Sequence, residues 1–328
     1  MTLAARAKVE LHLHLEGAAP PAFIRGLARE KGLDLSGIFA PDGSYATGDF
    51  RRFLKVYEAA CTALQGPDDY HRLTRAVLEQ SAAGGVIYTE AFLSPDFCGG
   101  RDPAAWQEHL HAIREAAEEA ERRDGIVMRG IVTAIRHLGP ERARETAICA
   151  AETAGDFVTG FGLAGDEGAG RPGDFRWAFD CAREAGLRLT CHAGEWGGPD
   201  SVRAAIRDLG VERIGHGVRA IEDPDLVEEI AGTGIVLECC PGSNIALGLY
   251  PGWRAHPIAR LRERGVKVTV STDDPPYFGT SMPNEYDRLA DAFGWDGEVF
   301  AEIERTSIGA AFCDRPTRDA ILKRLEAA

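Results

Sequence analysis

The stretch KVELHLH, residues 8–14, decides the fold of this 328-residue chain. Its valine and leucine residues alternate with polar ones, which is the pattern of a β-strand with two different faces. Residues two apart point the same way in a strand, so Glu10, His12 and His14 share one face and the aliphatic side chains share the other. In a barrel, such a strand would turn its leucines to the outer helices and its histidines to the axis.

Seven further short apolar runs follow, and most of them contain valine or isoleucine. The eight strand candidates are residues 8–14, 85–94, 127–137, 157–165, 187–194, 212–217, 234–241 and 266–275. Helical stretches separate them, so the sequence predicts an α/β fold, a closed (β/α)8 TIM barrel that spans residues 1–328 as one domain. The long segment of roughly residues 20–83 predicts a helical insertion between the first two strands, which is a candidate lid or pocket wall.

The composition argues against several classes of protein. A net charge of -14 disfavours a partner with a phosphate backbone, so no nucleic acid is expected. No apolar run reaches the roughly 18 residues of a membrane span, and the first residues lack the apolar segment of a secretory signal. The eight cysteines are scattered, which favours reduced thiols. We therefore expect a cytoplasmic protein with a small-molecule partner and no membrane partner, and the sequence leaves the oligomeric state open.

The pair His12 and His14 has two interpretations. Two neutral imidazoles that converge on one point form half of a zinc site. An isolated H-x-H is, however, more often a pair of hydrogen-bonded core residues. His109 and His111 repeat the spacing on the predicted helix 103–125, where residues two apart do not face each other. We expect that second pair to lie on the surface.

Polar residues also end several of the later strands. His192 and Glu195 follow the fifth strand, and His216 lies between two glycines after the sixth. Asp273 and Asp274 end the eighth strand before two prolines. Each ending alone is compatible with a turn or a helix cap. The carboxyl ends of barrel strands meet at one mouth, so together they predict a metal-dependent active site there.

Six motifs across residues 12–275 carry a family resemblance. HLHLEGA, GLAGDE, HAGE, RIGHG, CPGSN and STDDP occur in this order, and their combination resembles the adenosine deaminase family of metal-dependent amidohydrolases. The resemblance covers nearly the whole chain. It implies a (β/α)8 barrel with one Zn²⁺ ion per chain and a purine substrate. The zinc ligands that it implies are His12, His14, His192 and Asp273.

The same resemblance implies roles for other motif residues. Glu195, His216 and Asp274 would be catalytic, because zinc can lower the pKa of water from 15.7 to about 7 and so make hydroxide available to add to C6 of the purine. Glu195 would protonate the ring at N1, His216 would accept a proton from the water or orient it, and Asp274 would hydrogen-bond to N7. Gly165 would offer its backbone to the purine. Glu16 lies where the family holds a sugar hydroxyl.

The motifs leave two kinds of purine open as the substrate. Glu16 and the segment PYFG, residues 276–279, are similar to adenine deaminases, whereas Gly215 and the CPGSN segment are similar to bacterial adenosine deaminases. We favour adenosine or 2′-deoxyadenosine, hydrolysed to inosine or 2′-deoxyinosine and ammonia. Adenine or another N6-aminopurine derivative is the alternative. A non-catalytic purine-binding barrel is less favoured, because all the matched positions are filled.

Overall fold

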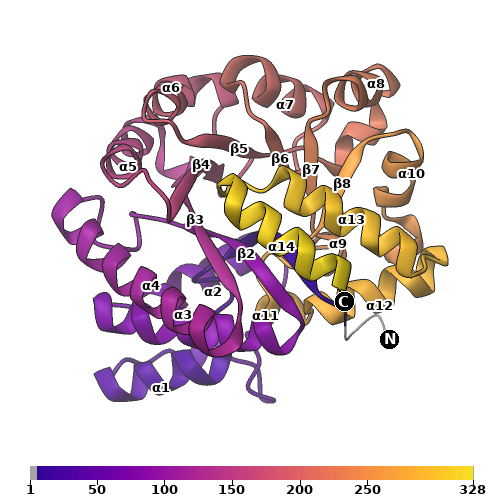
Figure 1. Cartoon of the computed structure of the whole chain (residues 1–328). Coiled ribbons are helices and arrows are strands. Elements are labelled where there is room, and N and C mark those ends of the chain that lie inside the picture. The colour runs from indigo at the N-terminus through magenta and orange to yellow at the C-terminus, as the bar shows by residue number, and fades with distance from the viewer. Residues whose placement is uncertain (1–5, 328) are drawn as a thin grey trace.

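The computed structural model describes residues 6–327, which form a barrel of eight parallel strands surrounded by helices (Figure 1). The strands are β1 Lys8–His14, β2 Val86–Leu93, β3 Val127–Ile135, β4 Val158–Ala164, β5 Arg188–Ala193, β6 Arg213–His216, β7 Val236–Cys239 and β8 Lys267–Val270. Each strand pairs with the next in chain order, from β1 to β8. The predicted (β/α)8 TIM barrel is confirmed, and each of the eight predicted strands is present.

The barrel closes between its first and last strands. Leu13 of β1 forms an isolated parallel bridge with Asp273, just beyond β8. The His14 N–H donates to the Asp273 carbonyl at 3.0 Å, and the Asp273 N–H donates to the His12 carbonyl at 3.1 Å. This seam brings the first motif of the chain beside the last one.

All the strands except β1 are shorter than the apolar runs that predicted them, and two of them end where the backbone changes direction at the mouth. β3 stops at Ile135, and Arg136–Leu138 form a turn of 3-10 helix instead. β8 stops at Val270, and Asp273 then adopts a left-handed backbone with φ 67°, which an extended strand does not accommodate. The chain therefore leaves the sheet at the carboxyl mouth, where its polar residues follow.

Helices cover the outside of the barrel, and three of them form the predicted insertion between β1 and β2. The helices are α1 Pro21–Lys31, α2 Phe50–Cys61, α3 Pro67–Ala83, α4 Pro103–Asp124, α5 Pro140–Glu152, α6 Arg176–Glu184, α7 Pro199–Ala204, α8 Pro224–Thr233, α9 Pro241–Ala246, α10 Ile258–Glu263, α11 Pro275–Phe278, α12 Met282–Phe293, α13 Gly297–Ala310 and α14 Arg315–Ala327. α2 begins after Asp49, whose side chain caps the helix by accepting from the Arg52 N–H. Within residues 6–327, no helix combines the length and apolarity needed to cross a bilayer.

Helix α4 confirms one prediction and corrects another. It ends at Gly125, whose left-handed backbone, φ 73°, caps the last turn as expected. His111 is exposed, but His109 is buried, so the expectation that both lie on the surface is wrong for His109. The reason is that α4 packs on α3, where the His109 ring meets Tyr70 edge-on at 5.3 Å. Its Nδ1 is hydrogen-bonded to the Ala105 carbonyl at 2.7 Å, which satisfies the buried ring.

The C-terminal segment closes the amino end of the barrel. α13 packs on β8 and β1, and α13 and α14 lie across the barrel in Figure 1. The segment between them places the Phe312 ring 3.6 Å from the guanidinium of Arg213. Arg213 is buried in the barrel and pairs with both Glu90 and Glu238 at 2.6 Å. The polar interior is thus neutralised by its own ion pairs, and the opposite, carboxyl end carries the site.

Candidate active site

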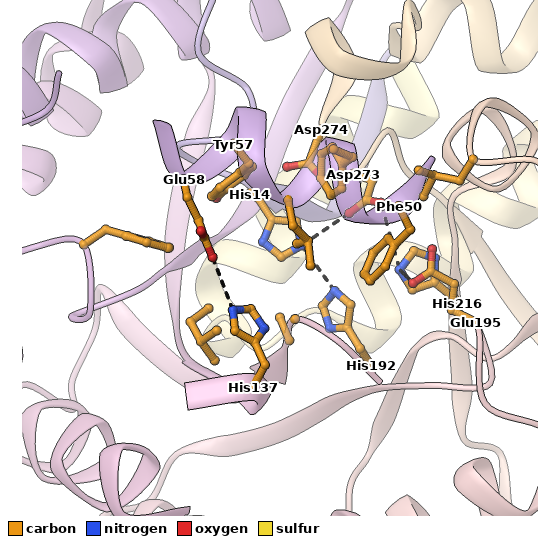
Figure 2. Close-up of a pocket in the computed structure, with 17 residues that line it drawn as sticks. His14, Phe50, Tyr57, Glu58, His137, His192, Glu195, His216, Asp273 and Asp274 are labelled. Atoms are coloured by element: carbon orange, nitrogen blue, oxygen red, sulfur yellow. Dashed lines mark hydrogen bonds and ion pairs between the residues drawn. The ribbon is translucent and has the colours of Figure 1, made fainter. Parts of the chain in front are cut away.

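Four side chains meet at the carboxyl mouth: two from β1, one from β5 and one from the turn after β8. They are His12, His14, His192 and Asp273, and their nearest nitrogen and oxygen atoms all lie within 4.8 Å of one another. Nε2 of His12 and of His14 lie 3.3 and 3.2 Å from Asp273 Oδ1. Nε2 of His14 and of His192 are 3.2 Å apart, and Figure 2 shows these groups pointing toward one another. The fold therefore brings together all four residues that the sequence predicted as zinc ligands.

The chemistry of this set fits a divalent metal ion. Nε2 of His12 is buried and has no hydrogen-bond partner within residues 6–327. Nε2 of His14 and of His192 face each other, and burial lowers the pKa of both imidazoles, so both are neutral near pH 7. Although burial opposes protonation of His12, hydrogen bonds to Asp273 and Glu238 raise its pKa to about 9, so a metal ion would displace a proton from this ring. Three imidazoles and one carboxylate are a donor set that suits zinc.

Two residues at this mouth have a strained backbone. Asp273 and His216 adopt left-handed conformations, with φ 67° and φ 60°. Such a conformation costs a residue other than glycine about 1–3 kcal/mol, and it persists where the surrounding structure holds it. The two turns bring His216 Nε2 to 4.0 Å from Asp273 Oδ2. Strain of this kind is typical of functional positions.

A buried carboxylate inside the barrel orients His12. Glu238 Oε2 accepts a hydrogen bond from His12 Nδ1 at 2.8 Å. Glu238 Oε1 accepts from Arg213 Nε at 2.6 Å and from the Thr190 hydroxyl at 2.9 Å. Although burial opposes ionisation, Arg213 and His12 keep the pKa of Glu238 below its ordinary value. Because Nδ1 of His12 donates to Glu238, Nε2 is the ring nitrogen that would bind a metal ion.

The sequence analysis missed Glu238. The available signal was a single carboxylate within the apolar run GIVLECC, residues 234–240, which a barrel strand would bury.

Glu195, His216 and Asp274 border the four converging side chains. Glu195 Oε2 lies 3.8 Å from His216 Nε2. Burial and the nearby Asp273 charge raise the pKa of both Glu195 and Asp274 well above their ordinary values. Burial lowers the pKa of His216 to about 4. The site therefore presents two protonated carboxyl groups and one neutral imidazole near pH 7, which can donate hydrogen bonds or protons to a substrate.

The loop that carries Glu195 is held in place by Glu167. The Glu167 carboxylate accepts hydrogen bonds from the four backbone N–H groups of residues 194–197, at 2.6 to 3.0 Å, and from the Ser201 hydroxyl. Burial raises the pKa of Glu167, but these hydrogen bonds outweigh it and keep the pKa below its ordinary value. Glu167 ends the GLAGDE motif, which identified the segment without indicating that one carboxylate shapes the loop after β5.

A cavity with a water-accessible volume of about 70 Å³ adjoins these groups. Its apolar lining comes mostly from α2 and from segments that follow the strands: Phe50, Phe53, Leu54, Tyr57, Phe97, Ile135 and Leu247. Gly165 is part of the wall, with φ 94°, and a Cβ at this position would come within 2.8 Å of His137 Nδ1. Glu58 of α2 pairs with His137 Nε2 at 3.5 Å at the edge of the cavity (Figure 2). An apolar cavity with a few convergent polar groups suits a small aromatic heterocycle.

The residues just after β1 serve the site in two different ways. Glu16 is buried, and its Oε1 accepts hydrogen bonds from the Tyr70 hydroxyl at 3.2 Å and from the Cys98 thiol at 3.6 Å. Burial raises the pKa of Glu16 to about 7, and in the described part of the chain Glu16 is not among the cavity-lining residues. A Cβ at Gly17 would lie 1.5 Å from Asp274 Oδ1, so the glycine leaves room for that carboxyl group.

Gly215 has a structural explanation that is independent of the substrate. It lies on β6 beside the converging histidines. A Cβ at this position would come within 2.9 Å of His12 Cε1 and 3.1 Å of His192 Nδ1. Contacts this short would force the imidazoles apart. Packing alone therefore explains why glycine occupies position 215. Its resemblance to adenosine deaminases at this position does not indicate which purine is the substrate.

Comparisons with known proteins agree with this geometry. A family model described as adenosine deaminase matches residues 7–328. Two curated relatives, from Chelativorans sp. and Rhizobium leguminosarum, are both named adenine deaminase. Each is 47% identical over 97% of this chain and 98% of its own length.

Solved structures have the same fold. The adenine deaminase of Arthrobacter aurescens superposes with a TM-score of 0.89 and 30% identity, over 98% of this chain and 99% of that one. An amidohydrolase from Burkholderia ambifaria, crystallised with bound zinc, has a TM-score of 0.85 and 28% identity, over 100% of this chain and 96% of that one. With a family model that spans nearly its whole length and relatives at 47% identity, this chain belongs to the adenosine deaminase family.

Proposed function

We propose that this protein is a zinc-dependent adenine deaminase, which converts adenine and water into hypoxanthine and ammonia. This is the alternative that the sequence left open, and the preference for adenosine is not confirmed. The relatives at 47% identity are named adenine deaminase, and so is the structure with a TM-score of 0.89. A cytoplasmic location is part of the proposal, and the eight free cysteines are compatible with it.

The contacts of the Glu16 side chain favour adenine over adenosine as the substrate. In the family resemblance this position holds a sugar hydroxyl. Here its Oε1 already accepts from Tyr70 and Cys98, and the side chain is 3% exposed. In the described part of the chain Glu16 does not line the cavity, so its carboxyl group would have to move away from these partners to reach a ribose hydroxyl there. A buried polar group left without a partner costs about 1–3 kcal/mol. Adenine has no ribose and makes no such demand.

The metal would be held by His12, His14, His192 and Asp273, with Glu238 orienting the first of them. A zinc ion bound by these residues would supply a water molecule with its pKa lowered from 15.7 to about 7. Ser243 donates its hydroxyl to Asp273 Oδ2 at 2.7 Å, which leaves Oδ1 toward the histidines.

The remaining groups act on the purine itself. Glu195, kept protonated by burial, donates a proton to N1 while C6 becomes tetrahedral. Asp274 is also protonated, and its buried Oδ1 has no hydrogen-bond partner within residues 6–327, so this carboxyl group is free to bind the ring at N7. Gly165 offers its backbone at the cavity wall. The apolar side chains of α2 cover the ring and exclude bulk water.

Turnover of four purines by the zinc-loaded protein tests the proposal. Release of the amine, which is ammonia from adenine and its nucleosides and methylamine from N6-methyladenine, should be fastest with adenine, by at least about 100-fold in kcat/KM over adenosine, deoxyadenosine and N6-methyladenine. That ratio corresponds to about 2.7 kcal/mol of discrimination. A wild-type protein that deaminates adenosine faster than adenine would refute the choice of substrate, and an absence of ammonia or methylamine release with all four would refute deamination.

A matched pair of variants tests the role of Glu16. Glu16→Ala removes the carboxyl group and opens space beside the cavity, so the adenosine-to-adenine ratio of kcat/KM should rise by about tenfold or more. Glu16→Gln keeps the volume and should leave adenosine excluded. An unchanged ratio in Glu16→Ala would mean that Glu16 does not select the substrate.

A further inference from the structure

The buried side-chain amide of Asn244 lies within hydrogen-bond distance of both Glu195 and His216. Asn244, on α9, is fully buried. Its Nδ2 lies 3.4 Å from Glu195 Oε1 and 3.4 Å from His216 Nδ1. An amide nitrogen has two N–H bonds and can only donate, so it can serve these two acceptors at the same time.

The orientation of this amide is set by a second buried residue, His256. The Ile258 N–H donates to His256 Nδ1 at 3.3 Å. A backbone N–H cannot accept, so Nδ1 carries the lone pair and a neutral ring has its proton on Nε2. His256 Nε2 then donates to Asn244 Oδ1 at 3.1 Å. Burial lowers the pKa of His256 to about 3, which is consistent with a neutral ring.

The backbone N–H of residue 258 is the first donor in this series of hydrogen bonds, and it fixes the direction of the others. Asn244 must present its oxygen to His256 and its nitrogen to Glu195 and His216, because the reverse orientation would set two donors against each other. His216 therefore accepts at Nδ1, and its own proton lies on Nε2. That nitrogen points to Glu195 Oε2 at 3.8 Å and Asp273 Oδ2 at 4.0 Å.

We propose that Asn244, oriented by His256, is a positioning residue that fixes where the protons of both catalytic groups lie. It holds His216 with its proton on Nε2 and Glu195 with its proton on Oε2, the oxygen that does not accept from Asn244. The role of these protons in turnover rests on the proposed deamination, whereas their positions rest on the hydrogen bonds alone.

The position of the proton on His216 selects one of the two roles that the sequence left open for this residue. With a proton on Nε2, the ring has no lone pair toward the centre of the site. It donates a hydrogen bond to the oxygen that adds to C6, and it does not remove a proton from it. Glu195 accepts from Asn244 at Oε1, so its other oxygen is the one that carries a proton toward N1. One amide thus gives both groups the donor role.

Nitrogen NMR of the wild-type protein tests the proposal directly. The rings of the nine histidines are labelled with ¹⁵N, and spectra are recorded with and without zinc. A His216→Gln variant assigns the His216 signals, and His256→Phe assigns those of His256. We expect an unprotonated Nδ1 and a protonated Nε2 on both rings. A protonated Nδ1 on His216 in the zinc-loaded protein would overturn the proposal, and the result does not depend on which purine is the substrate.

Asn244→Asp places an acceptor where the wild type has a donor. The His216 proton should move to Nδ1 in the spectrum, and kcat for adenine should fall by about 10²–10⁴-fold, the range for a misplaced acid or base group. KM should change by less than about threefold and the zinc content should not change, because Asn244 would contact neither the purine ring nor the zinc ion. The control is Asn284→Asp on α12, whose amide donates to the Thr280 hydroxyl outside the site. It should behave as the wild type.

His256→Phe gives an independent variant if Asn244→Asp does not fold. It releases the amide, so both tautomers of His216 should appear and kcat should fall by about tenfold or more. If either variant keeps the wild-type tautomer of His216, the positioning role proposed for Asn244 and His256 is overturned. Retained tautomers together with a lost kcat would indicate a packing role only, and would also overturn it.

Discussion

Replacing Glu238 by glutamine separates the orientation of a metal ligand from the metal ligands themselves. Within residues 6–327 Glu238 is not among the residues that line the cavity, and its carboxylate accepts three hydrogen bonds, from His12 Nδ1 at 2.8 Å, Arg213 Nε at 2.6 Å and the Thr190 hydroxyl at 2.9 Å. Glutamine has the same shape but only one acceptor oxygen. That oxygen should stay with Arg213, because a guanidinium can only donate, and the Thr190 hydroxyl shares the same oxygen.

The amide nitrogen of the variant then faces His12 Nδ1. Two donors cannot face each other, so His12 must move its proton to Nε2, the atom that should bind zinc. Zinc binding must reverse this arrangement, and the charge-assisted hydrogen bond is lost as well. A hydrogen bond to a charged group contributes about 1.5–3 kcal/mol. At about 1.4 kcal/mol per decade, zinc affinity should fall roughly 10- to 150-fold, which matches the effect expected for a residue that orients a metal ligand.

The variant should also lose stability in the metal-free state. Arg213 keeps its second partner, Glu90, at 2.6 Å. The loss should therefore be at or below about 3 kcal/mol, the lower end of the range for a broken buried ion pair. Urea unfolding of the metal-free protein measures this loss separately from the metal affinity.

Competition with a chelator of known affinity measures the zinc Kd of the variant and of the wild type. The control is Glu304→Gln on α13, which is also a buried carboxyl group and accepts from the Val9 N–H at 2.6 Å, away from the four ligands. It should lose stability and keep its zinc affinity. A Glu238→Gln protein with the wild-type Kd would refute the reasoning that Glu238 sets the tautomer of His12.

Two further predictions concern the reacting groups. Glu195→Gln should lower kcat by at least about 10³-fold with normal zinc content by elemental analysis; near-wild-type turnover would mean another proton donor. Because the acid must be protonated and burial raises its pKa, kcat/KM of the wild type should fall as the pH rises through that raised pKa, and the residual rate of Glu195→Gln should lack this limb. Gly17→Ala puts a Cβ 1.5 Å from Asp274 Oδ1 and should reduce kcat/KM at least about tenfold, whereas Gly26→Ala on α1, with no atom within 4 Å of its Cβ, should be active and slightly more stable. Equal kinetics for the two glycine variants would contradict the packing argument.

The sequence by itself determined the barrel and the identity of the side chains at its mouth. Alternating apolar residues and short valine-rich runs predicted eight strands, because burial on one face or on both leaves a local periodic pattern. Parallel strands of a barrel all end at the same side, so polar residues at the strand ends had to meet. His12, His14, His192 and Asp273 converge within 4.8 Å for that reason.

Only the tertiary structure decided which residues orient the side chains of this site. Glu238 meets His12 across 226 residues, and Asn244 meets Glu195 across 49, distances over which a local pattern carries no information. The partners of Glu16 and the burial of His109 likewise depend on how α3 packs on its neighbours. Periodicity reports which face of an element is buried. The direction of a hydrogen bond depends on which donor lies opposite which acceptor, and only the folded chain places them opposite each other.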